Sequence, residues 1–177
     1  MLLNSEIQLV VTAIGEDKPG MVSKLTQMVS ETNCNIIDSR IAIMGNEFSF
    51  IMLLEGDLAA ISRVEYLLPS LGVELGLLTM MKRTQKNQQT NYSAGYTLAY
   101  SGPDKPGTLS KVTRIMADHQ VNIAALKSDT IEQEDVEIMR SELEINVTES
   151  VDINQFKLEL ENLFADLGVE HILKRIR

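Results

Sequence analysis

The sequence has one cysteine, two histidines and no tryptophan among its 177 residues. A single cysteine, Cys34, cannot form an intramolecular disulfide, and with only His119 and His171 beside it the usual cysteine and histidine frameworks for zinc are absent. We therefore expect no metal and no other cofactor. A chain that does not use disulfides is typical of a reducing compartment, so we expect it in the cytoplasm.

Long apolar runs and basic charge are also scarce. No uncharged apolar stretch approaches the roughly 18 residues of a spanning helix, and the first residues lack the pattern of a signal peptide, so we expect no membrane partner. Sixteen basic residues against 25 acidic ones give a formal net charge of -9. A surface of that sign repels phosphate backbones, which argues against direct nucleic-acid binding.

One segment of the chain occurs twice. Gly15-Glu-Asp-Lys-Pro-Gly20 returns 87 positions later as Gly102-Pro-Asp-Lys-Pro-Gly107, and ten of 22 positions are identical when residues 15–36 are compared with residues 102–123. We interpret this as a duplicated domain. The copies are expected at residues 1–81 and 93–177, with the polar stretch 82–92 as a linker.

Apolar spacing within each copy predicts the order βαββαβ. In the first copy the expected elements are strands at 7–14, 36–44, 48–54 and 73–81, a helix from Pro19-Gly20 to about 32–33, and a helix capped by Asp57 that stops at Pro69 and Gly72. In the second copy they are strands at 96–100, 123–130, 138–147 and 169–176 and helices at 108–119 and 153–167. The acidic insertion 129–140 is expected to lengthen the hairpin of this copy. Its acidic run 132–137 is expected to be a solvated loop, although it could meet a basic partner. This order predicts the α+β, ferredoxin-like fold, in which two helices cover one face of a four-stranded antiparallel sheet.

The repeated turn Gly-x-Asp-Lys-Pro-Gly is the element expected to carry function. Gly15 and Gly102 are expected to allow unusual backbone angles where the first strand ends. Gly20 and Gly107 leave the first amides of the following helix uncovered. Those amides have no partner within the helix and lie at the positive end of its dipole, so a ligand carboxylate would be stabilised there.

An aspartate in the same turn supplies the opposite charge. Asp17 or Asp104 accepts hydrogen bonds when ionised and could hold an ammonium group, so the turn offers partners for both charges of an amino acid. The alternative is that Asp17 merely caps the helix. A phosphate-binding loop is a poorer explanation, because Met21-Val22 and Thr108-Leu109 stand where lysine and serine or threonine are needed.

With Asn-Ile at the start of the second strand of each copy, the pattern resembles the ACT domain, a small-molecule sensor module that typically binds amino acids. The resemblance implies ligand contacts from the loop aspartate, the helix start and the Asn-Ile pair of each copy: Asp17, Gly20, Met21, Asn35, Ile36, Asp104, Gly107, Thr108, Asn122 and Ile123. Several amino-acid-binding ACT domains carry asparagine where this chain has aspartate. If the Met21 side chain projects into its pocket, the first copy should prefer the smaller ligand.

Two ACT domains without a catalytic domain resemble the glycine cleavage system transcriptional repressor family. The resemblance implies a non-catalytic regulator that senses a small amino acid, glycine first, and represses transcription by binding a DNA-binding activator protein, with the ligand relieving the repression. ACT pockets lie where the helix-start loop of one domain meets the second strand of another. The facing domain would come from the same chain or from a second copy in a homo-oligomer.

Three other functions stay open at this point. One is a stand-alone ACT regulatory or interaction module that controls an enzyme of amino-acid metabolism. A small enzyme would need a base or nucleophile with an orienting partner, and the sequence shows no such set. An RNA-binding domain of this fold should carry aromatic residues and a basic face, whereas this chain has 5% aromatic residues and acidic domains.

Overall fold

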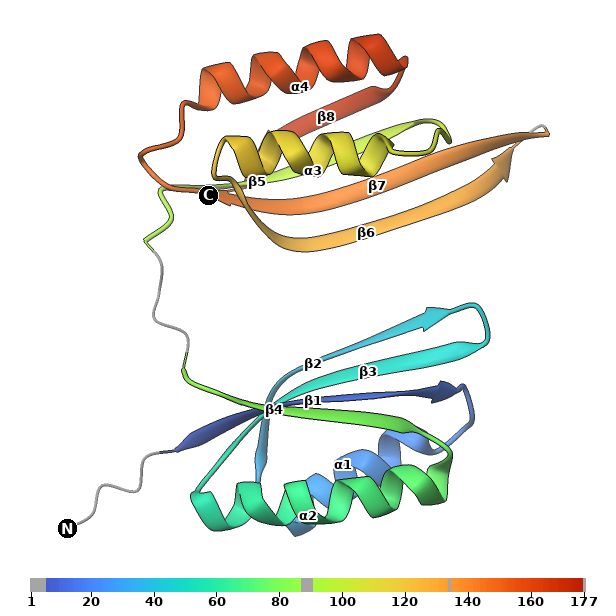
Figure 1. Ribbon diagram of the computed structural model, residues 1–177, viewed down its shortest axis with the longest axis vertical. Coiled ribbons are helices and arrows are strands. Elements are labelled where there is room, and N and C mark those ends of the chain that lie inside the picture. The colour runs from blue at the N-terminus through green and yellow to red at the C-terminus, as the bar shows by residue number, and fades with distance from the viewer. Residues whose placement is uncertain (1–5, 87–90, 134, 177) are drawn as a thin grey trace. The chain divides into compact units, whose positions relative to one another are not determined.

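The structure is a computed structural model that describes residues 6–86, 91–133 and 135–176. The chain divides into two compact units, Met1–Gln88 and Gln89–Arg177. Each unit is a four-stranded antiparallel sheet with two helices on one face, and the other face of the sheet is not covered by its own unit (Figure 1). The predicted α+β fold, with two βαββαβ units in tandem, is confirmed.

The first unit follows the expected order of elements. It consists of β1 (Ile7–Glu16), α1 (Met21–Glu31), β2 (Asn35–Met44), β3 (Glu47–Gly56), α2 (Leu58–Leu75) and β4 (Leu78–Thr84). The strand order is β2-β3-β1-β4, with β1 antiparallel to both neighbours. Leu9, Val11 and Ala13 of β1 point toward the helices and are completely buried, because alternate residues of a strand face opposite sides of the sheet.

The second unit repeats this topology. It consists of β5 (Ala94–Pro103), α3 (Thr108–Asp118), β6 (Asn122–Gln133), β7 (Val136–Val147), α4 (Ile153–Leu167) and β8 (Glu170–Arg175), with the strand order β6-β7-β5-β8. Its core contains Leu98 of the central strand, Leu143 of β7, Val112 and Met116 of α3, and the α4 residue Phe156. Each unit therefore has a hydrophobic core of its own between sheet and helices.

Helix α2 differs from the expectation. Asp57 caps it as predicted, because its carboxylate accepts a hydrogen bond of 2.7 Å from the amide of Ala60. The helix does not stop at Pro69 and Gly72 but continues to Leu75 and ends at Gly76, which has a left-handed backbone. The last strand of the unit therefore starts later than predicted.

Strand β4 corrects the expected linker. It begins at Leu78, not at residue 73, and continues through Lys82, Arg83 and Thr84, which were expected in the linker 82–92. Arg83 donates hydrogen bonds of 2.8 and 2.6 Å to the Glu65 carboxylate of α2, so it is part of the first unit. Positions 87–90 of the expected linker lie outside the described residues.

The acidic run 132–137 belongs largely to strands rather than to a loop. Strands β6 and β7 run through it as an antiparallel ladder whose last pair joins Gln133 to Val136. Asp135, which follows the undescribed position 134, has a positive φ of 64°, as tight hairpin turns require. The insertion therefore lengthens two strands of the second sheet.

Candidate functional site

The first glycine of each repeated turn is needed for close packing rather than for an unusual backbone angle. Gly15 and Gly102 lie within strands, and neither is among the residues with positive φ. A Cβ atom on Gly15 would come within 2.9 Å of the carbonyl oxygen of Gly76, and one on Gly102 within 3.1 Å of the Cα atom of Val169. The expectation about their backbone angles was wrong, because the chain after the second helix of each unit approaches them closely.

The second glycine of each turn does need its conformational freedom. Gly20 and Gly107 have φ angles of 89° and 86° at the positions just before α1 and α3. No side chain caps either helix, which contradicts the alternative in which Asp17 acts only as a helix cap. The first amide of each helix bonds within its own turn, that of Met21 to the Lys18 carbonyl at 3.4 Å and that of Thr108 to the Lys105 carbonyl at 3.3 Å. The amides that follow in the first turn have no acceptor within the helix.

Met21 and Thr108 begin the two helices, and both side chains are buried. Met21 is 6% exposed and belongs to the first core, while Thr108 is 2% exposed and donates a hydrogen bond of 3.0 Å from its hydroxyl to the carbonyl of Lys105. Neither side chain can set the size of a ligand pocket, so the suggested preference of the first copy for smaller ligands has no structural basis. Their backbone amides donate to the carbonyls of Lys18 and Lys105, so a ligand that contacts these amides has to replace those acceptors.

The two aspartates lie beside the tip of the neighbouring hairpin. In the first unit, the amide of Asp17 donates to the carbonyl of Asn46 at 3.3 Å. An open hollow of about 500 Å³ lies between the turn and the hairpin, and Asp17, Asn46 and Ile43 line it. In the second unit, the amide of Asp104 donates to the carbonyl of Glu137 at 3.0 Å. Both aspartates are exposed, so their carboxylates are accessible to a charged ligand.

The Asn-Ile pairs lie at the opposite end of each sheet. Asn35 pairs with Glu55, which in turn pairs with Gln8 at the start of β1, whereas Asp17 follows the last residue of β1. Nine residues of extended chain separate Gln8 from Asp17, a distance of about 30 Å. Within one unit, Asn35 and Ile36 therefore cannot contact a small ligand that is held by Asp17.

The second unit has the same separation. Asn122, which Ile123 follows, pairs with Asn146, and Asn146 pairs with Gly95 near the start of β5. Asp104 lies just beyond the other end of β5. Asn35 and Asn122 are exposed, and Ile36 and Ile123 are half-buried. Each unit thus presents two halves of the predicted ligand site at its two ends.

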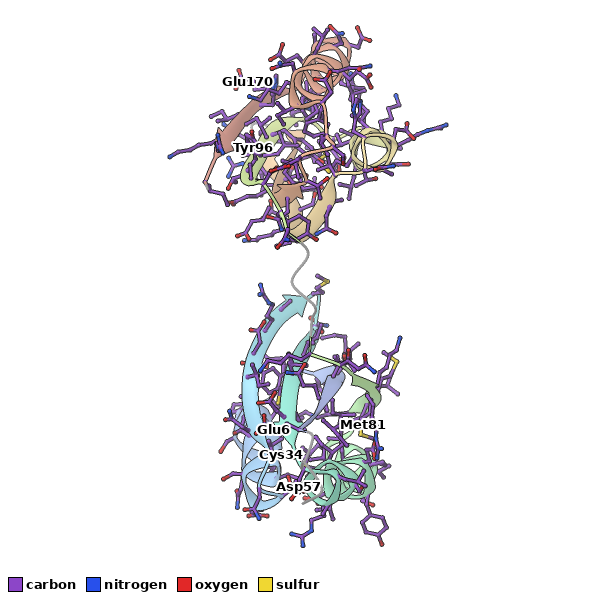
Figure 2. The ribbon with its side chains drawn as sticks, turned by 90° about the vertical axis from the view of Figure 1, so that its left-hand side faces the viewer. Glu6, Cys34, Asp57, Met81, Tyr96 and Glu170 are labelled. Carbon is purple, nitrogen blue, oxygen red and sulfur yellow. The ribbon has the colours of Figure 1, made fainter. Side chains whose placement is uncertain are left out.

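Cys34 is a packed side chain. It lies against the first core, and burial raises the pKa of its thiol, with a smaller contribution from the Asp57 carboxylate nearby (Figure 2). A thiol whose pKa is raised is a poor nucleophile at neutral pH. Cys34 therefore serves packing rather than catalysis.

The two histidines serve structural contacts in the second unit. His119 follows α3 and lies 3.0 Å from the Glu159 carboxylate, and this contact holds the pKa of Glu159 below its usual range. His171 stacks on Phe164 with ring centroids 4.7 Å apart. In the described ranges, no group of three or more histidine, cysteine or acidic residues is arranged to hold a metal ion. No helix within those same ranges is long and apolar enough to cross a membrane.

The uncovered face of the second sheet carries a hollow that the sequence reasoning missed. It has a volume of about 740 Å³, with small residues of the central strand at its floor and charged residues of both signs around them: Ala99, Ser101, Lys127, Asp129, Arg140, Glu142 and Glu170. Alternating charges along β6 and β7 were the available signal, because the strands that carry them were predicted at 123–130 and 138–147, but no site was inferred from them. The same face of the first sheet is mixed: exposed apolar side chains such as Leu78 and Met80 lie there beside polar ones such as Thr12 and Arg40.

Family models match both units. A model described as "ACT domain" matches residues 7–82, and a second of the same description matches residues 96–168. The glycine cleavage system transcriptional repressor of Escherichia coli K12 is 38% identical over 170 residues, which are 96% of this chain and 88% of that protein. The UPF0237 protein MMP0657 of Methanococcus maripaludis is 37% identical over 73 residues, 39% of this chain and 79% of that protein.

Solved structures give the same result over nearly the whole chain. A crystal structure provisionally described as a glycine cleavage system transcriptional repressor has a TM-score of 0.76 at 34% identity and covers 98% of this chain and 99% of its own. An unknown protein from Galdieria sulphuraria shares the fold, with a TM-score of 0.79 at 21% identity, and covers 98% of this chain and 100% of its own. The chain therefore belongs to the tandem ACT-domain family that includes the glycine cleavage system transcriptional repressor, a family of regulators.

Proposed function

We propose that this chain is a non-catalytic sensor of glycine that represses glycine cleavage genes. In this proposal it binds a DNA-binding activator protein and holds it inactive, and glycine relieves the repression. The observation that carries the proposal is the relationship to a transcriptional repressor across 96% of the chain. A regulator of transcription acts where the DNA is, so the proposal places the chain in the cytoplasm.

The turn geometry supports amino-acid binding. Beyond the amides of Met21 and Thr108, which bond within the turns, the first-turn amides of α1 and α3 have no acceptor within the helix, and the helix dipole there stabilises a ligand carboxylate. The exposed carboxylates of Asp17 and Asp104 lie in the same turns and can accept hydrogen bonds from a ligand ammonium group. The proposed contacts of Met21 and Thr108 are made through the backbone, because both side chains are buried.

A complete site needs a second ACT domain. The turn and the Asn-Ile pair of one unit lie about 30 Å apart, so a ligand at the turn can meet Asn35 or Asn122 only if the other end of a different ACT domain faces it. We propose that each turn is completed in this way by Asn35 and Ile36 or by Asn122 and Ile123. Ligand binding would then depend on how domains associate, which gives glycine a means to change the surface offered to another protein.

The uncovered face of the first sheet supports contact with a protein rather than with DNA. We call it the apolar open face, and its members are Ile14, Ile51, Leu53, Leu78 and Met80. Leu78 is 76% exposed and Met80 is 66% exposed. Clustered exposed apolar side chains are typical of protein-binding surfaces, and a net charge of -9 disfavours a phosphate backbone. We propose that this face binds the activator.

A charge substitution with a matched control tests the proposed contact. Met80→Glu places a carboxylate in the apolar open face, whereas Ile172→Glu places one at the corresponding exposed position of β8, on the charged face of the second sheet. Repression of a glycine cleavage promoter in cells should be lost with Met80→Glu and kept with Ile172→Glu. Equal repression by both variants would contradict the proposed surface.

A further inference from the structure

The two Asp-Lys-Pro-Gly turns differ in the residue that the neighbouring edge strand places beside them. Ile43 of β2 and Thr130 of β6 occupy matched positions, because each lies two strands across from the first glycine of its own turn. Both strands lie at the edges of their sheets. The duplication thus carries an aliphatic side chain in one copy and a hydroxyl in the other at the same place.

In the second unit the hydroxyl holds the aspartate. The Thr130 Oγ1 atom donates a hydrogen bond of 2.9 Å to the Oδ2 atom of Asp104, and the Asp104 amide donates to the Glu137 carbonyl at 3.0 Å. The next residue, Lys105, donates from its ammonium group to the Leu167 carbonyl at 3.2 Å. The turn is therefore fixed both through its backbone and through the Asp104 carboxylate.

In the first unit the aspartate has no such contact. Ile43 lines the hollow beside Asp17 but has no group that can donate a hydrogen bond, and among the described residues no hydrogen bond or ion pair to the Asp17 carboxylate is found. Lys18 pairs with Glu16 at 2.7 Å instead of reaching across to a helix. A ligand that binds the Asp17 carboxylate therefore has to immobilise this side chain when it binds.

We propose that Thr130 is a positioning residue that makes the turn of the second domain the tighter of the two amino-acid sites. An ionised carboxylate offers about four lone-pair positions, so one bond from Thr130 leaves room for a ligand ammonium group. A carboxylate that is already oriented does not have to be immobilised when the ligand binds. The inference rests on the proposed binding of an amino acid at these turns, and it assigns the first domain the weaker site.

Titration calorimetry with glycine on the full chain tests the assignment. In an Asp17→Ala background, which leaves the second turn to bind, Thr130→Val should weaken glycine binding about tenfold, because it removes a hydrogen bond to a charged group while keeping the shape of the side chain. Thr130→Ser restores a hydroxyl and should bind within about twofold of the parent. In an Asp104→Ala background, Ile43→Thr should tighten the first site, and the control Ile43→Val should leave it unchanged.

The outcomes separate this inference from the proposed function. Glycine binding that is the same with Val, Ser and Thr at position 130 would overturn the role of Thr130 and leave amino-acid sensing intact. An Ile43→Thr variant with unchanged affinity would overturn the claim that this position makes the sites unequal. Absence of binding by the unsubstituted chain for glycine and all other amino acids would overturn the proposed function and the inference together.

Discussion

At matched positions of the two sheets, each core contains one aromatic ring. The ring belongs to β3 in the first unit and to the central strand β5 in the second. In the first unit Ala13 of the central strand lies opposite Phe50, and in the second unit Tyr100 of the central strand lies opposite Ser141. A small and a large side chain share the space in both cases, which keeps the packed volume similar. The Tyr100 hydroxyl is buried and makes no hydrogen bond within the described part of the chain. The Ser141 hydroxyl bonds to Ser128 at 2.7 Å, and it is near enough to Tyr100 to act on the pKa of that group.

Removal of this hydroxyl should therefore stabilise the second domain. Tyr100→Phe keeps the ring against Phe164 and deletes a buried polar group with no partner, so we expect the free energy of unfolding to rise by about 1 kcal/mol. Urea denaturation measures the change. Tyr66→Phe, at a side chain that is 81% exposed, should have no measurable effect. A loss of stability in Tyr100→Phe would show that the hydroxyl is bonded.

The same site gives a pH dependence. Burial raises the pKa of Tyr100, and Ser141 opposes the rise only partly. Below the ordinary tyrosine pKa of about 10, the hydroxyl is protonated in both the folded and the unfolded chain. Above that pH the unfolded chain loses the proton first, so the free energy of unfolding falls as the pH rises. Denaturation curves of the wild type and Tyr100→Phe should diverge further above about pH 10 than at neutral pH.

At the scale of the element, α2 shows why its end was predicted wrongly. Proline and glycine are strong signals for a helix end, but Pro69 is exposed and removes only the hydrogen bond to the carbonyl one turn before it. The buried positions Ile61, Val64, Leu68 and Gly72 continue at helical spacing through the proline. Gly72 belongs to this buried stripe. Leu77 and Thr79 pack so closely against it that a hydrogen atom fits there but a methyl group does not.

Gly72→Ala should destabilise the first domain. A Cβ atom there would lie 2.8 Å from the Thr79 Cγ2 atom and 3.2 Å from the Leu77 carbonyl oxygen, so β4 must shift. We expect a loss of about 1–3 kcal/mol in the free energy of unfolding, although alanine is the better helix former. Thermal melting would measure the loss, with exposed Ser70→Ala as the control. An unchanged or higher melting temperature would contradict the close packing.

The fold was predictable from the sequence because the signals repeat. Apolar spacing gave the type and order of all twelve elements, and the second copy of the turn made the duplication clear. The hairpin of β6 and β7 was predicted, but the extension of its strands to Gln133 and from Val136 was missed, because the acidic residues there have the composition of a loop. The contact between Thr130 and Asp104 was missed as well, since 26 residues separate them and only the pairing register brings them together.

At the scale of the whole molecule, the charge distribution predicts no affinity for DNA by the chain alone. Lys82, Arg83 and Lys86 are the basic residues of the stretch 82–92, and Arg83 is already engaged by Glu65. So few phosphate contacts give little affinity at physiological salt. A gel-shift experiment with glycine cleavage promoter DNA should therefore show no complex. A sequence-specific shift without a second protein would contradict regulation through an activator.

The central claim is that the repeated turn binds a small amino acid, and calorimetric titration of the chain with each of the twenty amino acids tests it most directly. The account predicts saturable binding of glycine that Asp17→Ala and Asp104→Ala together abolish. It also predicts unchanged melting temperatures in the same variants, because neither carboxylate caps a helix. Silence across the twenty amino acids, or glycine binding that survives both substitutions, would contradict it.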